Sequence, residues 1–395
     1  MERRRRMGAA YSRVTIAMTG THRASPLGLR DHGLRRLVVT TLFLSAVAAD
    51  PLHSQQTVQV TREPACTNCR IIATRSAAIG EKDGAGTIGT APWLACRQRG
   101  RLFAAVTMSR PGEVLIFDHV GRFRRAFGRA GEGPGEFRVG FPLRFGPGDS
   151  LWIFQPSSRR VAVFDSSFKY VRTLTLPTAA SAVSLFANGT VALQGSIPSR
   201  ERIGLPIHLL SAAGVLGRSF GSSTAEVRPD DQFVSARRLA PASGGRVWSA
   251  RLTEYTVERW DTAGTMDLRL VVESAWFRPW RPDPANPRAT GPMIIDVQQD
   301  ASGLLWVLIS VRDPSFDENR FSKTSQHARR SSSATSVEYD SVIEVIDPER
   351  RRVLATTKLG SNMRGFACEG NAFAYKEDES GNPFLEVWSL SFTTR

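Results

Sequence analysis

Beyond residue 60 the chain consists of short apolar or alternating runs separated by turns rich in Gly, Asp, Asn and Ser. Alternation over roughly four to eight residues is typical of half-buried β-strands, and no long run shows the helical period of about 3.6 residues. Six runs share one form, a small or polar turn followed by an apolar strand, and three of them have Trp at the same place. These runs are GRLFAAV (100–106), DSLWIFQ (149–155), NGTVALQ (188–194), GGRVWSA (244–250), SGLLWVL (302–308) and GNAFAYK (370–376).

An alternating strand, in most cases a turn, and a further strand follow five of these runs, and the turns give the length of the repeat. The turns HVGR, SSFK, AAGV and TAGT begin at residues 119, 166, 212 and 262, so the spacings are 47, 46 and 50. A period of about 40–50 residues with four strands per unit is typical of β-propeller blades. The sequence therefore predicts an all-β fold, a six-bladed β-propeller with four-stranded blades.

The sixth unit is incomplete at the C-terminus. Residues 364–391 supply three strands and the chain ends at Arg395. Arg70–Gly80 (RIIATRSAAIG) ends in the same apolar-Gly pair as Phe127-Gly128, and a similar Gly-rich stretch follows it. We expect this N-terminal strand to complete the last blade, which pairs the two chain ends and removes an open sheet edge.

The connection between the first two units, Ala126–Pro142 (AFGRAGEGPGEFRVGFP), holds an aromatic-Gly pair, a Gly-rich turn and a Pro before the next strand. Glycines accept positive φ, so such a stretch can cross from one sheet to the next. Together with the preceding FDHVGRF it resembles the NHL-repeat group of six-bladed β-propellers, over roughly residues 70–391. The resemblance implies the fold and leaves the function open, because the group includes protein-binding scaffolds, RNA-binding domains, sensor domains and a few lyases.

Two insertions interrupt the period, at residues 276–291 and 312–340. The first contains Trp276, Trp280 and several Arg and Pro residues, a composition typical of binding surfaces. The alternative is that these aromatic side chains cover the open side of a blade. The second is rich in Ser and Arg, and its composition favours a mobile loop.

The N-terminal region, residues 1–54, has the pattern of a leader. A basic flank precedes the apolar run 37–49 (LVVTTLFLSAVAA), which is shorter than the roughly 20 apolar residues of a membrane-spanning helix. These features predict a signal peptide and an exported protein, periplasmic or extracellular, with no membrane span after cleavage. Residues 55–69 are then an N-terminal extension of the propeller, residues 70–391, which is expected to be a monomer.

The formal net charge of +15 does not by itself indicate nucleic-acid binding. Residues 1–36 hold nine Arg against two acidic residues, a net +7, which leaves +8 spread over the rest of the chain. A moderately basic surface of this kind is compatible with acidic ligands.

Export changes the interpretation of the four cysteines, Cys66, Cys69, Cys96 and Cys368. In an oxidising compartment they are candidates for disulfides. Cys66 and Cys69 would form a local bond, with a redox motif as the alternative. Cys96 and Cys368 each follow an Ala on the first strands of the first and sixth units, so they could form a bond across the closed ring.

Candidate chemistry is sought on the first strand of each blade, which lines the central channel of a propeller. The only carboxylates there are Asp296 and Glu369 and no His is present, so the sequence predicts no metal site, no cofactor and no assigned catalytic residue. Positive charge is available from Arg97, Arg144, Arg237 or Arg238, and Arg364.

We select Arg144, Arg238, Asp296, Trp276 and Trp280 as candidate ligand-binding residues. The predicted function is an exported binding or scaffold module for a protein, a peptide or an anionic small ligand. The alternative is a lyase or lactonase acting at the channel.

Overall fold

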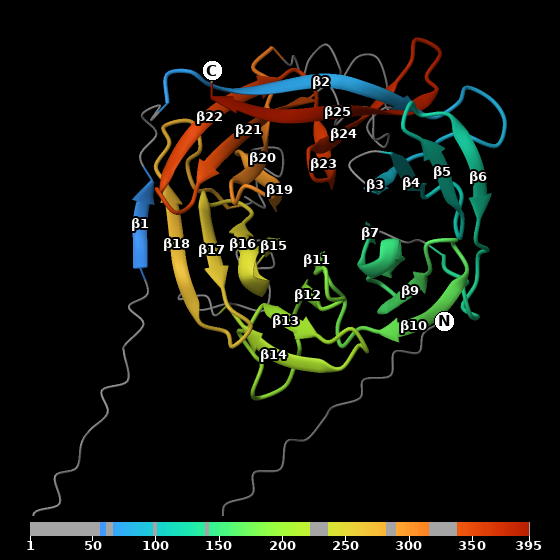
Figure 1. The fold of residues 1–395 in the computed structure, drawn as a ribbon, viewed down its shortest axis with the longest axis horizontal. Helices are drawn as coiled ribbons and strands as arrows, with labels where there is room; N and C mark the ends of the chain where they lie inside the picture. Colours follow the sequence, from blue (N-terminus) through green and yellow to red (C-terminus); the bar gives the residue numbers. More distant parts are fainter. Residues whose placement is uncertain are drawn as a thin grey trace, which may run out of the picture. The chain divides into compact units, whose positions relative to one another are not determined.

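A computed structural model describes residues 56–60, 66–97, 101–138, 142–221, 236–281, 290–315 and 338–394. The leader with its apolar run, residues 282–289 of the first insertion and residues 316–337 of the second lie outside the described residues. The described residues fall in one unit, His53–Arg395, which is built from six antiparallel sheets arranged as a ring (Figure 1).

Five sheets follow the chain in order, each from an inner strand to an outer one. The first sheet comprises β3 (Trp93–Arg97), β4 (Leu102–Val106), β5 (Val114–Asp118) and β6 (Phe123–Phe127). The second comprises β7 (Leu143–Phe145), β8 (Leu151–Gln155), β9 (Arg160–Phe164) and β10 (Tyr170–Thr175), and the third β11 (Ala182–Leu185), β12 (Val191–Gln194), β13 (Ile207–Leu210) and β14 (Leu216–Phe220). The fourth comprises β15 (Arg237–Ala242), β16 (Arg246–Arg251), β17 (Thr256–Trp260) and β18 (Met266–Val272), and the fifth β19 (Met293–Gln299), β20 (Leu305–Arg312), β21 (Tyr339–Asp347) and β22 (Arg352–Leu359). Two short 3-10 turns, η1 (Pro147–Asp149) and η2 (Ser243–Gly245), join inner to second strands.

The sixth sheet joins the two ends of the chain. Its strands are β23 (Met363–Cys368), β24 (Asn371–Glu377), β25 (Pro383–Thr394) and, at the outer edge, β2 (Cys69–Ile79). β2 runs antiparallel to β25 from Cys69 opposite Thr394 to Ile79 opposite Leu385. The N-terminal strand therefore supplies the outer strand that the last unit lacks.

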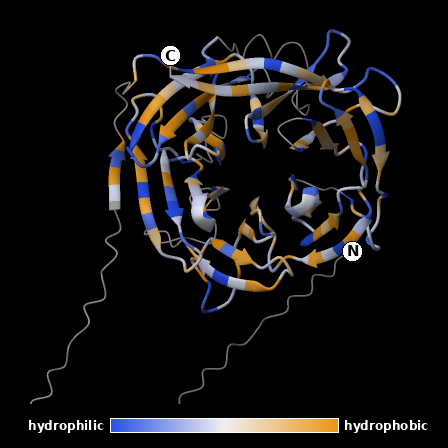
Figure 2. Ribbon diagram, viewed as in Figure 1, coloured by the Kyte–Doolittle hydropathy of each residue, from blue (hydrophilic) through white to orange (hydrophobic). Residues whose placement is uncertain are grey.

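The hydrophobic core is divided among the junctions between neighbouring sheets. Each of six clusters of buried side chains draws its members from two adjacent sheets. The recurring Trp residues of the second strands belong to these clusters, with Trp152, Trp248 and Trp306 only 2%, 0% and 7% exposed. Outer strands alternate in hydropathy along their length (Figure 2), and β18 alternates buried and half-buried residues throughout. Each sheet is thus stabilised by its neighbours, as burial of one face requires.

The fourth sheet carries a fifth strand that the sequence analysis did not anticipate. β1 (Gln56–Val60) lies parallel to the outer strand β18, with Gln56 opposite Leu268 and Val60 opposite Val272. Val60 is 2% exposed in the cluster between the fourth and fifth sheets. Part of the segment interpreted as a plain extension therefore belongs to the propeller.

The Gly-rich connection after the first sheet is organised around Glu136. Its carboxylate accepts a hydrogen bond from the Gly133 N–H at 2.9 Å and pairs with Arg129, and both contacts lower the pKa of Glu136. Gly128 has a φ of 96°, and a Cβ there would lie 2.4 Å from the carbonyl oxygen of Gly112. Phe137, at the end of the motif, is buried against the second sheet. The motif therefore fixes one sheet relative to the next.

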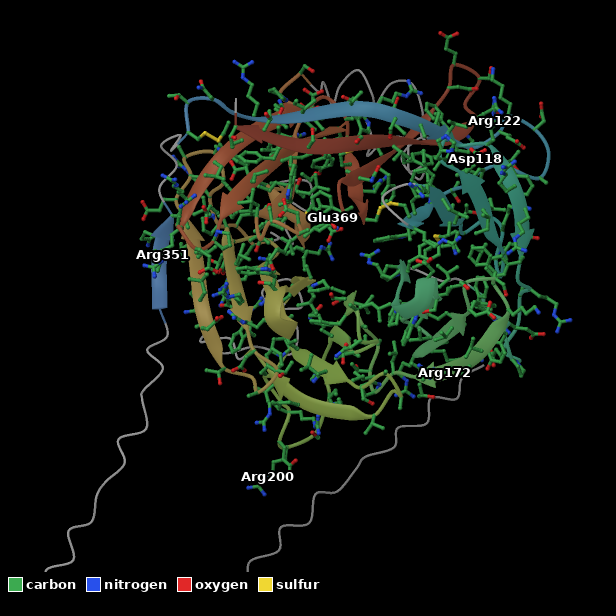
Figure 3. The ribbon with its side chains drawn as sticks, in the orientation of Figure 1. Asp118, Arg122, Arg172, Arg200, Arg351 and Glu369 are labelled. Carbon is green, nitrogen blue, oxygen red and sulfur yellow. A yellow bond between two sulfur atoms is a disulfide. The ribbon has the colours of Figure 1, made fainter. Side chains whose placement is uncertain are left out.

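Arginines on outer strands also connect neighbouring sheets, through hydrogen bonds on the periphery of the ring. Arg125 of β6 donates to the carbonyl of Ser167 at 2.9 Å, and Arg172 of β10 donates to that of Ala212 at 2.8 Å. Each acceptor lies in the turn before the outer strand of the following sheet. Arg172 lies on the outer side of the ring, whereas Glu369 lies toward its centre (Figure 3).

Candidate functional site

The inner strands surround two cavities on the axis of the ring. The rim cavity, of about 460 Å³, lies where these strands begin and has lining residues from all six sheets. The basal cavity, of about 230 Å³, lies where they end. Both are lined by Arg144, Val183, Leu239 and Asp296, so the two cavities meet at the level of these four residues.

Three charged side chains from three sheets line the rim cavity at or next to this level. Arg144 is the second residue of β7, Arg238 the second of β15, and Asp296 the fourth of β19. All three side chains are half-buried, and all three line the rim cavity. The structure therefore brings together three of the five residues selected from the sequence.

Asp296 is held by backbone donors. Its Oδ2 accepts from the Phe366 N–H at 2.9 Å and its Oδ1 from the Val297 N–H at 3.0 Å. A Cβ at residue 365 would lie 3.1 Å from Oδ2, so Gly365 leaves room for the carboxylate. Burial raises the pKa of Asp296, while the two arginines and the backbone donors act in the opposite direction.

Arg144 and Arg238 have fewer hydrogen-bond partners than the Asp296 carboxylate. Arg144 donates through Nη1 to the carbonyl of its neighbour Leu143 at 3.0 Å, whereas the buried Nε of Arg238 has no hydrogen-bond partner within the described ranges. No ion pair within 4.0 Å joins Asp296 to either arginine in that part of the chain. Burial lowers the pKa of both Arg144 and Arg238, with Asp296 acting in the opposite direction.

Further polar groups line the rim cavity around this level. Arg364 is the second residue of β23, and burial lowers its pKa. Tyr339 stands where the second insertion returns to β21, and its hydroxyl lies 2.7 Å from Thr290 Oγ1. Tyr339 lies on a third strand and is therefore absent from the candidates, which were chosen on inner strands.

The two selected tryptophans lie elsewhere. Trp276 packs against Phe277, with ring centroids 5.8 Å apart, at the edge of the core between the fourth and fifth sheets. Trp280 donates from Nε1 to the Pro292 carbonyl at 2.8 Å and lies against Gly291. Neither lines the rim cavity. Their observed contacts are those of side chains that cover a sheet junction.

Both disulfides are present. Cys66–Cys69 is local, and Cys96–Cys368 joins the inner strands β3 and β23 across the closure of the ring, each with Cα atoms 5.3 Å apart. Cys96 and Cys368 also line the basal cavity. Arg97, the next residue, turns instead to the second sheet and donates to the Ser166 carbonyl at 3.2 Å.

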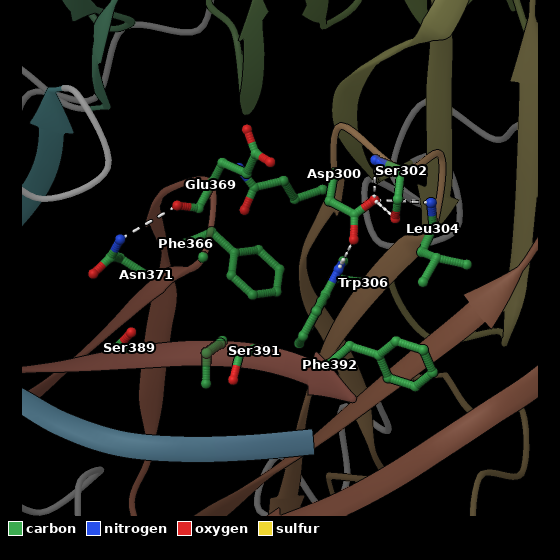
Figure 4. A pocket seen from close by; sticks show the side chains of 13 residues that line it. Asp300, Ser302, Leu304, Trp306, Phe366, Glu369, Asn371, Ser389, Ser391 and Phe392 are labelled. Atoms are coloured by element: carbon green, nitrogen blue, oxygen red, sulfur yellow. Dashed lines mark hydrogen bonds between the residues drawn. The ribbon is translucent and has the colours of Figure 1, made fainter. Parts of the chain in front are cut away.

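A separate pocket of about 330 Å³ lies between the fifth and sixth sheets (Figure 4). Its Asp300 carboxylate accepts from the N–H groups of Ser302 and Leu304 and from Trp306 Nε1 at 2.8–3.0 Å. Glu369 accepts from the Ala301 N–H at 3.2 Å. Both carboxylates therefore hold turns of the sheets.

Across the described ranges, no three His, Cys, Asp or Glu side chains lie close enough together to hold a metal ion. Within the same ranges, no helix has the length and apolar character needed to cross a membrane.

No protein-family model matches the chain, and no curated protein matches it. Among solved structures, a DUF4221-family member from Bacteroides vulgatus is 8% identical with a TM-score of 0.56, over 83% of this chain and 99% of that one. A predicted exported protein from Bacteroides fragilis is 11% identical with a TM-score of 0.53, over 85% and 99%. Virginiamycin B lyase from Staphylococcus aureus is 11% identical over 82% of this chain and 100% of that one, with a TM-score of only 0.42. At these identities the likeness shows the fold alone: this chain is a six-bladed β-propeller.

Proposed function

We propose that this protein is an exported binding module that holds an anionic ligand in the rim cavity, with Arg144 and Arg238 as the groups that contact the anion. One observation carries the proposal: two half-buried guanidinium groups face a cavity, and no described residue forms an ion pair with either of them within 4.0 Å. Buried charged donors without partners are costly, and a bound anion would supply the acceptors.

We also propose that the protein is exported and that it is a divergent relative of the NHL-repeat group. The signal-peptide pattern of residues 1–54 and the two disulfides support an oxidising compartment, periplasmic or extracellular. The Gly-rich motif around Glu136 supports a divergent relationship to the NHL-repeat group. N-terminal sequencing of protein secreted by a bacterial host should give a mature end shortly after residue 49, and retention of the apolar run would contradict export.

The experiment is calorimetric titration of the mature monomer with benzoate, inorganic phosphate and a short acidic peptide, alongside the neutral analogue benzamide. Arg144→Gln and Arg238→Gln should each weaken anion binding about 10-fold or more, the usual effect of losing a charged hydrogen bond. Arg172→Gln, on an outer strand, is the matched control and should bind as the wild type does.

Two results would overturn the proposal. One is anion binding that survives both cavity substitutions. The other is steady chemical conversion of the anion, which would indicate an enzyme of the lyase or lactonase class.

A further inference from the structure

The rim cavity is divided by depth into an apolar part and a charged part. Its outer wall includes the first residues of two inner strands, Trp93 and Met293, both half-buried. Arg144 and Asp296 lie at the level shared with the basal cavity, and Arg238 and Arg364 lie at the second position of their strands. A solute that enters from the rim therefore passes an apolar collar before it reaches the charges.

The depth of the cavity allows a ligand with both kinds of surface. Its volume of about 460 Å³ lies within the range of roughly 300–1,000 Å³ that small-molecule sites occupy. An inorganic anion would use the arginines and leave the collar in contact with water. An organic anion with an apolar body would also remove the half-buried side chains of Trp93 and Met293 from water, which favours binding in proportion to the apolar area buried.

Asp296 places an ionisable carboxyl group beside the position of the anion. Two backbone N–H groups hold its carboxylate in place, and Gly365 leaves space for it. The ionisable groups that line the two cavities around it are Arg144, Arg238, Arg364, Tyr339 and Glu369. The ionised carboxylate of Asp296 partly offsets the positive potential of the arginines. Protonation of Asp296 removes this offset.

Resting on the proposed function, we infer that the ligand is an amphiphilic organic anion. Its acidic group contacts Arg144 and Arg238 while its apolar body lies in the collar of Trp93 and Met293, and Asp296 competes electrostatically with this acidic group. A carboxylate and a sulfonate share the required chemistry. A sulfonate stays ionised at every pH of interest, so it reports the state of the protein alone.

The probes are naphthalene-1-sulfonate, methanesulfonate and naphthalene-1-methanol, titrated by calorimetry between pH 5 and pH 8. Naphthalene-1-sulfonate should bind at least about 10-fold more tightly than methanesulfonate, because only the former buries the collar. Met293→Ser should reduce that advantage and leave methanesulfonate unaffected. The neutral naphthalene-1-methanol should bind more weakly than the sulfonate.

The role of Asp296 gives a second, independent readout. Because burial raises its pKa, the affinity for the sulfonate should increase as the pH falls toward that pKa. Asp296→Asn should bind more tightly at pH 7 and lose the pH dependence. Glu369→Gln changes a carboxylate that lines the basal cavity but not the rim cavity, and this matched control should keep the wild-type profile.

The outcomes separate the two proposals. Equal binding of methanesulfonate and naphthalene-1-sulfonate, both weakened by Arg144→Gln, would overturn the apolar collar and leave the proposed anion site intact. A flat pH profile in the wild type, or unchanged affinity in Asp296→Asn, would overturn the competition by Asp296. Sulfonate binding that is absent, or indifferent to Arg144→Gln, would overturn both proposals.

Discussion

The disulfide Cys96–Cys368 offers a direct test of how the ring is closed, because it spans 272 residues whereas Cys66–Cys69 spans three. A disulfide stabilises the fold mainly by restricting the unfolded chain, and the entropy that it removes grows with the logarithm of the loop length. The hydrogen bonds between β2 and β25 close the same ring in the folded state, but they do not restrict the unfolded one. The two bonds should therefore differ strongly in their contribution to stability.

The magnitude follows from the ratio of the two loop lengths. The expected difference is (3/2)RT ln(272/3), about 4 kcal/mol at 25 °C, in favour of the bond across the ring. Since the two bonds have the same Cα separation of 5.3 Å, their geometry contributes little to the comparison.

The assay is urea unfolding, followed by tryptophan fluorescence, of two double variants. In Cys66→Ala/Cys69→Ala only the ring-closing bond remains, and addition of reductant should lower the free energy of unfolding by several kcal/mol. In Cys96→Ala/Cys368→Ala only the local bond remains, and reductant should have a much smaller effect. Mass spectrometry verifies the oxidation state of each sample.

A difference of less than about 1 kcal/mol between the two reductant effects would refute the entropic reasoning. It would mean that the unfolded chain keeps β2 and the sixth unit together without the covalent bond. Persistent contact between chain ends in high urea would then be expected in small-angle scattering, as a smaller radius for the reduced unfolded chain than its length predicts.

Three further predictions concern the periphery, the added strand and the buried carboxylate. Arg172→Ala should cost about 1 kcal/mol by removing the bond to the Ala212 carbonyl, and Arg124→Ala, an exposed ion-pair residue, close to nothing, both measured by urea unfolding. Deletion of β1 should accelerate amide hydrogen exchange in β18 while β10 stays unchanged; equal protection with and without β1 would contradict the pairing. Burial raises the folded pKa of Asp296 above its unfolded value, so its ionisation destabilises the fold as the pH rises above about 4. Asp296→Asn should thus gain stability relative to the wild type between pH 4 and pH 7, and a constant difference would exclude this linkage.

The repeat was predictable because its signals are local. Each sheet is a contiguous set of strands whose turns carry Gly and Asp at a constant spacing, so the period is visible without knowledge of the fold. β1 has no such signal. Its five residues, QTVQV, pair with β18 more than 200 residues away, and no turn connects the two.

The charged level of the channel was predictable only in part. Inner strands could be identified, but they are short and packed on both faces, so the sequence pattern does not fix which residues face the axis. Arg144 and Arg97 occupy comparable strands, yet Arg144 lines the cavities and Arg97 contacts the second sheet. Trp276 and Trp280 have the composition of a binding surface, and only the structure reveals their contacts with Phe277 and Gly291.

The architecture itself explains why, among the described residues, Arg144 and Arg238 have no ion-pair partner within 4.0 Å. Each inner strand can present about one side chain at a given level of the axis, since successive residues point to opposite faces. Asp296 is the acidic side chain at the junction of the two cavities, and it interacts electrostatically with Arg144 and Arg238. Two arginines and one carboxylate therefore leave an excess of positive charge at the rim cavity, which the proposed anion would balance.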